Sequence, residues 1–266
     1  MSAELLVEAR DGVEIVTLNR PDKLNAMSAG LIAELDAYFR GLQDRLDVRV
    51  VILRGAGRAF CAGLDLTPGS WPGREGEGPV QGGWRTQRAI ATVMQLMRQC
   101  PQPVIALGHG AACGGGFSLL LSSDVRIGAP SLRMNAAYIK IGLGGCDMGS
   151  SYFLPRLVGA SVAAEFILTG NFMGAERALQ CGLVSRVVEE EALLDAGLEL
   201  ARDMLATAPM GLRLSKDALN RNIDAPSFEA ALAIEDRQQV MLAQTQDFEE
   251  AKRAFAEKRA PDYKDR

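Results

Sequence analysis

The pattern of apolar and polar positions divides this chain of 266 residues into two parts. In the first part, short runs rich in β-branched residues alternate with longer amphipathic segments, which is typical of α/β folds. The apolar spacing from Leu31 to Leu42 predicts a helix that Ser28 caps, and a second helix is expected at 85–98. The short runs predict strands at 13–18, 48–53, 104–107 and 124–127.

The second part of the chain, after residue 159, has the periodicity of helices throughout. We expect six of them, at 162–168, 175–181, 192–205, 210–220, 227–244 and 248–258. The stretch 67–84 differs from both parts because it contains six glycines and three prolines. Such a composition predicts neither a helix nor a central strand there.

Two glycine-bearing segments, 58–66 and 108–117, carry the candidate chemistry. In the first, Ala62 and Gly63 leave little bulk around the backbone N–H of Leu64. In the second, three consecutive glycines separate a strand-like run from a helix-like run, and free N–H groups at a helix start carry partial positive charge. Either segment alone is consistent with an ordinary glycine turn. Two such donors converging on one carbonyl oxygen would form an oxyanion hole.

The order and spacing of these segments resemble the crotonase superfamily, also called the enoyl-CoA hydratase/isomerase family. Further motifs of the same family occur in the same order at 17–27, 154–159, 168–170, 175–178, 182–184 and 255–261. The resemblance implies an α/β fold, a spiral of repeated ββα units with a helical C-terminal region. It implies a core at 1–200 and a helical trimerisation region at 201–266, in a homotrimer or a dimer of trimers.

The resemblance also assigns roles to residues of the two segments. The donors of the oxyanion hole would be the N–H groups of Leu64 and Gly115. Coenzyme A would be part of the substrate, with no tightly bound cofactor and no metal. The residues implied to border the CoA thioester are Ala62, Gly63, Asp65, Leu66 and Gly114.

The proton-transfer positions depart from the hydratase pattern. Ser118 and Tyr138 occupy the places where hydratases carry two glutamates, and neither residue is a strong base near neutral pH. Asp147 falls where dienoyl-CoA isomerases of the family carry an aspartate, and also matches the nucleophile of 4-chlorobenzoyl-CoA dehalogenase. The alternative for Asp147 is a cap of a helix beginning near Met148. We expect double-bond isomerisation rather than two-glutamate hydration, because isomerisation needs only one shuttling base.

Two other functions are compatible with the sequence. The chain could be a non-catalytic acyl-CoA binding protein that kept the hole and lost the acid–base pair. It could instead be a serine hydrolase or thioesterase that uses Ser118 with His109, the sole histidine. Against the hydrolase, the residues around Ser118 lack the second glycine of the G-x-S-x-G motif. A structural role also explains His109 at a strand end better than a catalytic role does.

The resemblance places coenzyme A along residues 20–26. Lys23 would lie near its phosphates, and the backbones of Leu24 and Ala26 near its adenine and pantetheine. Phe255 and Lys258 from the last helix would close over the nucleotide, often from a neighbouring subunit. Without the resemblance, both lysines would be ordinary surface charges.

The segment 67–84 follows the first glycine segment directly. We expect either a mobile wall of the acyl pocket, with Trp71 or Trp84 covering the ligand, or an excursion that touches nothing. Met134 and Phe153 complete the expected apolar lining of this pocket.

Composition excludes other classes of protein. With 29 basic and 33 acidic residues the net charge is −4, so nucleic acid is not an expected partner. Five cysteines without C-x-x-C spacing predict reduced thiols. The first ten residues show no signal peptide, and the apolar runs are too short for a bilayer. We expect a cytoplasmic enzyme with no membrane partner.

Overall fold

The computed structural model describes residues 3–266, in which one sheet has the strand order β1-β2-β3-β4-β6-β9. Strand β1 is antiparallel to β2, and the other neighbouring pairs are parallel. The carboxyl ends of β2, β3, β4 and β6 therefore meet at one edge of the sheet. The strands are β1 (Leu5–Arg10), β2 (Val13–Leu18), β3 (Val50–Gly55), β4 (Val104–Gly108), β6 (Val125–Gly128) and β9 (Arg186–Val187).

A second, smaller sheet contains β5 (Ala111–Cys113), β7 (Arg133–Asn135) and β8 (Met173–Gly174), in that order. Strands β4 and β5 lead into helix α3 (Gly115–Ser122). Strands β6 and β7 lead in the same way, through a short 3₁₀ turn, into helix α4 (Ser150–Val158). Each ββα unit thus gives one strand to each sheet, and the chain winds as a spiral.

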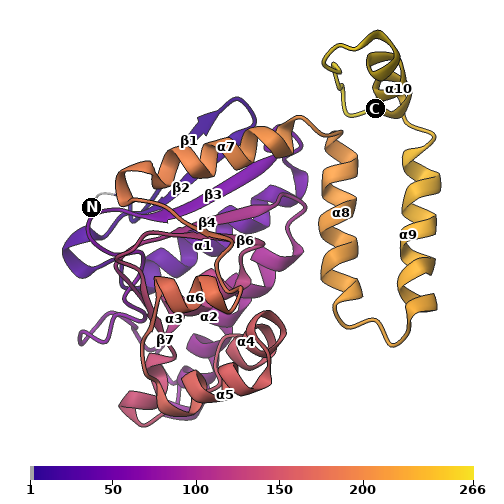
Figure 1. Cartoon of the computed structure of the whole chain (residues 1–266). Helices are drawn as coiled ribbons and strands as arrows, with labels where there is room; N and C mark the ends of the chain where they lie inside the picture. The colour runs from indigo at the N-terminus through magenta and orange to yellow at the C-terminus, as the bar shows by residue number, and fades with distance from the viewer. Residues whose placement is uncertain (1–2) are drawn as a thin grey trace.

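Helices cover both faces of the large sheet (Figure 1). Because side chains alternate along a strand, Ile15 and Ile52 pack under helix α7 (Leu193–Leu205), while their neighbours Val16 and Leu53 face the opposite way. That second face is covered by α1 (Ala29–Gly41), α2 (Pro79–Gln99) and α3. Helices α5 (Ala160–Thr169) and α6 (Ala175–Gln180) follow α4.

The last three helices form an arm that extends from the body of the molecule (Figure 1). Helices α8 (Pro209–Asn222) and α9 (Phe228–Leu242) run side by side, and α10 (Gln246–Glu257) lies beyond their ends. Helix α7 crosses position 200 and packs on the sheet, and the division of the chain at 200/201 stays a prediction. None of the helices in the described part of the chain has the length and apolar content needed to cross a membrane.

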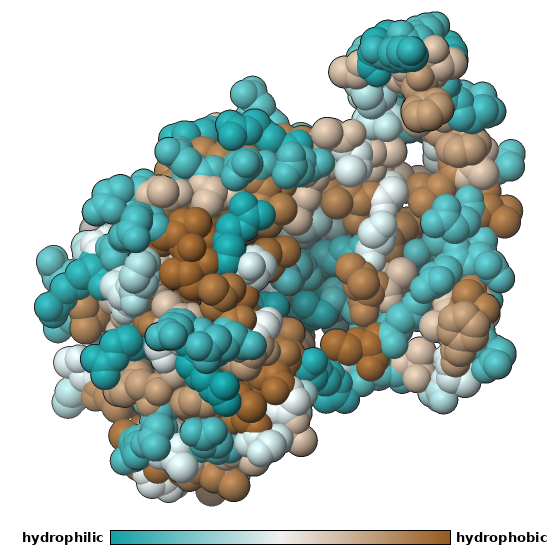
Figure 2. Space-filling view, in the orientation of Figure 1, coloured by the Kyte–Doolittle hydropathy of each residue, from teal (hydrophilic) through white to brown (hydrophobic). Residues whose placement is uncertain are grey.

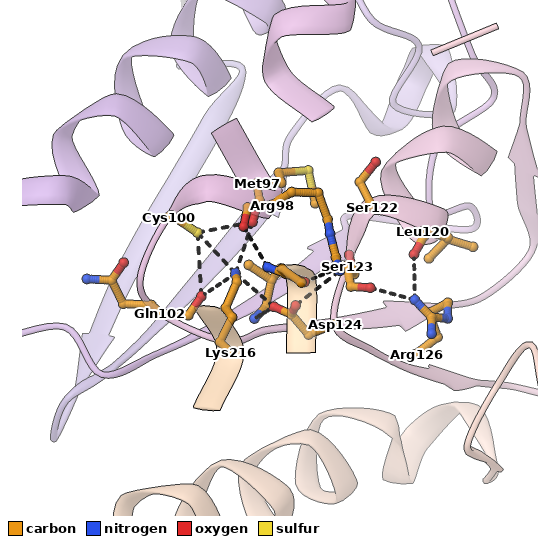
Figure 3. A network of polar contacts seen from close by, with 12 residues as sticks. Met97, Arg98, Cys100, Gln102, Leu120, Ser122, Ser123, Asp124, Arg126 and Lys216 are labelled. Atoms are coloured by element: carbon orange, nitrogen blue, oxygen red, sulfur yellow. Dashed lines mark hydrogen bonds and ion pairs between the residues drawn. The ribbon is translucent and has the colours of Figure 1, made fainter. Parts of the chain in front are cut away.

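A buried lysine ties the arm to the body (Figure 3). The ammonium of Lys216, on α8, donates to the carbonyl oxygens of Met97 at 3.0 Å and Gln102 at 2.8 Å. It also pairs with Asp124 at 2.9 Å. Since Asp124 in turn accepts the backbone N–H of Val104 at 2.8 Å, the ion pair links α8 to the first residue of β4.

Most expected elements are present, with ends shifted by a few residues. The strand at 13–18 is confirmed, and the Ser28 hydroxyl accepts the Leu31 N–H at 3.0 Å as an N-cap. The expectation of no helix in 67–84 is wrong for 79–84, because α2 begins at Pro79. Proline suits the first turn of a helix, where no backbone N–H donor is needed. Strand β1 was not predicted.

Replacing Lys216 by Met should lower the free energy of unfolding by about 2 kcal/mol, because the Met97 and Gln102 carbonyls lose a donor while Asp124 keeps its pair with Arg98. Urea unfolding followed by circular dichroism measures this loss. The control is Lys252→Met, which removes a surface ion pair with Glu249 and should change little. Equal midpoints for the two variants would contradict a role for Lys216 in anchoring the arm.

Candidate active site

Backbone hydrogen bonds join the two glycine segments side by side. The Cys61 N–H donates to the Ala111 carbonyl at 3.0 Å, and the Cys113 N–H donates back to the Cys61 carbonyl at 3.0 Å. This bridge extends the small sheet by one strand position. Segments fifty residues apart in the sequence therefore meet at one place in the fold.

Two glycines allow this close approach. A Cβ atom at Gly116 would overlap the carbonyl oxygen of Cys61, and the backbone there cannot easily move. Gly63 has a φ of 102°, and a Cβ atom on it would lie 2.9 Å from the Cys113 carbonyl oxygen. The same Cβ position is 3.8 Å from the nitrogen of Gly115, which shows how near the two segments lie.

The two predicted donors, Leu64 and Gly115, both have free N–H groups. On either side of Leu64, the Met27 N–H donates to Gly63 at 2.7 Å and the Asp65 N–H donates to Met27 at 2.9 Å. Gly115 is the first residue of α3, where backbone N–H groups have no partner within the helix. Within residues 3–266, neither N–H donates a hydrogen bond to another protein group.

Asp147 lies in the loop before α4, one residue before a side chain that reaches Gly115. Its neighbour Met148 is buried, and the Met148 sulfur lies 3.6 Å from the position of a Cβ on Gly115. The Asp147 carboxylate accepts the Met148 N–H at 2.7 Å and the side-chain amide of Gln87. Asp147 is not the N-cap of α4, because Gly149 occupies that position and the helix starts at Ser150.

Ser118 and Tyr138 are also brought to this place, but both are buried. Burial raises the pKa of the Tyr138 phenol, which the nearby Ser150 and Ser118 hydroxyls lower to a smaller extent. Neither the Tyr138 hydroxyl nor the Ser118 hydroxyl makes a hydrogen bond of good geometry within residues 3–266. The pair is therefore neutral and supplies no carboxylate.

His109 is not arranged as a base for Ser118. It is buried at the start of the turn after β4, and its Nε2 lies 2.8 Å from the Gly57 carbonyl oxygen. The Ser118 hydroxyl has no hydrogen-bond partner among the described residues. This geometry offers no nucleophile–base pair of the kind that a serine hydrolase requires.

A cavity of about 360 Å³ adjoins Leu64, within the size range of small-molecule sites. It lies between the segment after Leu64 and helix α2, and its lining includes Leu64, Trp71, Thr86, Gln87 and Ile90. The Trp71 indole N–H donates to the Asp65 carbonyl at 3.0 Å, so residues 67–78 form a wall of this cavity.

The other expected lining residues lie elsewhere. Trp84 is 69% exposed on α2 and does not cover the cavity. Met134 is fully buried in the core, and Phe153 packs against the core from α4. Trp84 is exposed because it lies on the outer face of the helix that begins at Pro79.

The predicted CoA segment forms a tight turn beside the first glycine segment. Lys23 is exposed, and the Leu24 carbonyl accepts the Ala62 N–H at 2.9 Å. Leu24 has a left-handed φ of 50°, an uncommon conformation for leucine. The Ala26 carbonyl accepts from the Arg20 guanidinium.

Arg20 also pairs with Asp65 at 2.8 Å, which connects the turn to the first glycine segment. Hydrogen bonds from Thr67 and Arg20 hold the pKa of the Asp65 carboxyl well below its usual range. Leu66 is exposed next to it. Gly114, at the other segment, donates its N–H to the Asn135 carbonyl at 2.9 Å.

Within one chain, Phe255 and Lys258 lie far from the two glycine segments. Phe255 is 87% exposed on α10, and Lys258 ends that helix. Figure 1 shows α10 at the far end of the arm, well away from α3. Their contact with the nucleotide stays a prediction.

Sequence reasoning missed Gln87, Ser150 and Met27. The side chain of Met27 covers Gly115, and the Ser150 hydroxyl accepts the Asp147 N–H at 3.0 Å. Gln87 is a polar residue in the middle of a helix, and no motif marks it. Only the packing of α2 beside the loop before α4 reveals its contact with Asp147.

Comparisons with known proteins agree with this architecture. A sequence model of the family Enoyl-CoA hydratase/isomerase matches residues 8–266. A probable enoyl-CoA hydratase of Mycobacterium bovis is 38% identical, over 100% of this chain and 94% of the relative. The 1,2-epoxyphenylacetyl-CoA isomerase of Escherichia coli is 32% identical, over 97% of each chain.

Solved structures confirm the predicted fold class. An enoyl-CoA hydratase from Bacillus anthracis superposes with a TM-score of 0.92 at 34% identity, covering 99% of this chain and 100% of the other. A probable enoyl-CoA hydratase/isomerase from Mycobacterium abscessus gives a TM-score of 0.91 at 34% identity, with 99% of both chains covered. This chain is an enzyme of the enoyl-CoA hydratase/isomerase family, in the crotonase superfamily.

Proposed function

We propose that this enzyme isomerises the double bond of an enoyl-CoA thioester, with Asp147 as the single proton shuttle. The observation that supports this function most is the set of side chains around the two free N–H groups. It holds the Asp147 carboxylate beside the neutral hydroxyls of Ser118 and Tyr138, whereas the nearby carboxylates of Asp65 and Glu77 are paired with Arg20 and Arg85. Both isomerases and hydratases occur among the relatives, so the family alone does not choose between them.

In the proposed reaction the thioester oxygen accepts hydrogen bonds from the Leu64 and Gly115 N–H groups. Asp147 removes a proton from C2 of a 3-enoyl-CoA, and the C–H electron pair moves into a dienolate whose oxygen lies in the hole. The proton then returns from Asp147 to C4, which moves the double bond to C2–C3 and restores the carboxylate. Each hole donor contributes about 2.7–4 kcal/mol to transition-state stabilisation in known cases.

Ser118 and Tyr138 do not supply the acid–base groups that hydration requires. A water must be held and deprotonated on one side while a proton is delivered to C2. The buried Tyr138 phenol has a raised pKa, and the Ser118 hydroxyl is harder still to deprotonate. The cavity beside Leu64 is the proposed acyl pocket, and the turn at residues 20–26 is the proposed track for coenzyme A, with Lys23 at its phosphates.

Asp147→Asn should lower turnover of 3-enoyl-CoA at least about 100-fold, because the shuttling base is lost. Affinity for the CoA ester should stay near that of the wild type, since the hole and the pocket are unchanged. Absorbance at the enoyl thioester band and mass spectrometry of the product measure both isomerisation and any gain of water. Asp203→Asn, an exposed change on α7, is the matched control.

The outcomes separate the candidate functions. Product of unchanged mass with a shifted double bond, lost in Asp147→Asn, supports the isomerase. Product heavier by one water contradicts it. Tight binding of the ester without turnover by the wild type would identify a non-catalytic acyl-CoA binder instead.

We also propose that the enzyme is a homotrimer or a dimer of trimers assembled through the C-terminal arm. Helix α9 has no buried residue within one chain, although it carries apolar side chains. Figure 2 shows brown, hydrophobic surface on this arm among teal residues. The exposed apolar residues of α8, α9 and α10 and their connections are Leu219, Ile223, Phe228, Val240, Met241, Phe248 and Phe255. Association would remove this surface from water and bring Phe255 and Lys258 to a neighbouring active site.

Light scattering should give a mass three or six times the chain mass of 28.5 kDa. Val240→Asp should shift this mass toward one chain, because a charge on an associating apolar face is costly to bury. Val80→Asp, at a similarly exposed valine on α2, should leave the mass unchanged. A wild-type mass of one chain would contradict the assembly.

A further inference from the structure

We infer that Gln87 is the positioning residue for Asp147. Its side-chain amide, on α2, donates a hydrogen bond to Asp147 Oδ1 across sixty residues of sequence. Gln87 also lines the cavity next to Leu64. It therefore lies where an acyl group, the hole donor and the base come together. This inference rests on the proposed function of Asp147 as the base.

The contacts of Asp147 leave one carboxylate oxygen for chemistry. Gln87 and the Met148 N–H both donate to Oδ1. Among the described residues, no hydrogen bond or ion pair engages Oδ2. The Ser150 hydroxyl accepts the Asp147 backbone N–H at 3.0 Å, which restrains the backbone but leaves the side chain free to rotate. The Gln87 amide limits that rotation.

The local backbone explains why a second element is needed. Asp147 stands in a loop between a 3₁₀ turn and α4, and the next residue, Met148, has a left-handed φ of 45°. Loop residues are held less firmly than residues on helices. A donor on the 21-residue helix α2 supplies a fixed reference for the carboxylate. Misplacement of a catalytic group by about 1 Å can cost about 100-fold in rate.

Gln87 also connects the base with the wall of the acyl cavity. Residues 67–78 lead directly into α2, and Thr86 and Ile90 line the cavity beside Gln87. An acyl group seated against Trp71 would contact the same stretch of helix that orients Asp147. Substrate binding and alignment of the base are thus coupled through one rigid element.

The test compares Gln87→Ala and Gln87→Glu with the wild type on 3-enoyl-CoA. Gln87→Ala should lower kcat about 10-fold and change KM little, because the base is misaligned while the hole is intact. Alanine and glutamate are good helix formers, so α2 should persist, as circular dichroism can verify. Gln95→Ala, an exposed change two turns later on the same helix, is the control and should match the wild type.

Gln87→Glu tests the positioning role through the pH dependence of kcat, which would not change if Gln87 had only a structural role. At neutral pH the introduced carboxylate repels Asp147, and activity should fall at least as far as in Gln87→Ala. As pH decreases, the two carboxyl groups share one proton, and the protonated carboxyl introduced at position 87 can donate as the native amide does. The ratio of variant to wild-type kcat should therefore rise toward acid pH.

The results have distinct meanings. Loss of activity in Asp147→Asn with wild-type kcat in Gln87→Ala and an unaltered pH profile in Gln87→Glu would overturn the inference alone. Full activity in Asp147→Asn would overturn both the proposed function and the inference. A reduced kcat in Gln87→Ala, with acid recovery in Gln87→Glu, supports the positioning role.

Discussion

The site depends on the pair of backbone hydrogen bonds between Cys61 and the strand Ala111–Cys113. These bonds hold one glycine segment against the other, and the missing side chain at Gly116 lets α3 start in contact with the Cys61 carbonyl. Any larger residue at Gly116 would separate the segments. The positions of the Leu64 and Gly115 N–H groups both follow from this one contact.

The surroundings of those N–H groups limit the chemistry that the enzyme can perform. The hydroxyls of Ser118 and Tyr138 are both buried there, and burial raises the pKa of the Tyr138 phenol. The Asp147 carboxylate comes from the loop before α4 and accepts a hydrogen bond from Gln87 on α2. In the proposed reaction, one carboxylate that serves two carbons in turn is sufficient to move a double bond.

The sequence predicted the elements that local periodicity encodes, such as the strand at 13–18 and the cap at Ser28. Through the family motifs it also nominated Leu64, Gly115, Ser118 and Asp147 as site residues, and their roles stay a prediction. It did not predict that 79–84 joins α2, because glycine and proline content outweighed the longer apolar pattern downstream. The sequence could not predict the contacts of Gln87 and Lys216, because both depend on tertiary packing of a helix against a distant segment.

Helix α3 has a buried cation at the end opposite the active site. The Arg126 guanidinium lies against the carbonyl oxygens of Leu120 and Ser123 and donates to Leu183 at 2.7 Å, and burial lowers its pKa to about 10. The negative end of the helix is therefore neutralised inside the protein, while the positive end at Gly115 stays directed at the site. Because Arg126 is buried, dissolved salt screens its contact with the helix end less than it screens an ion pair at the surface.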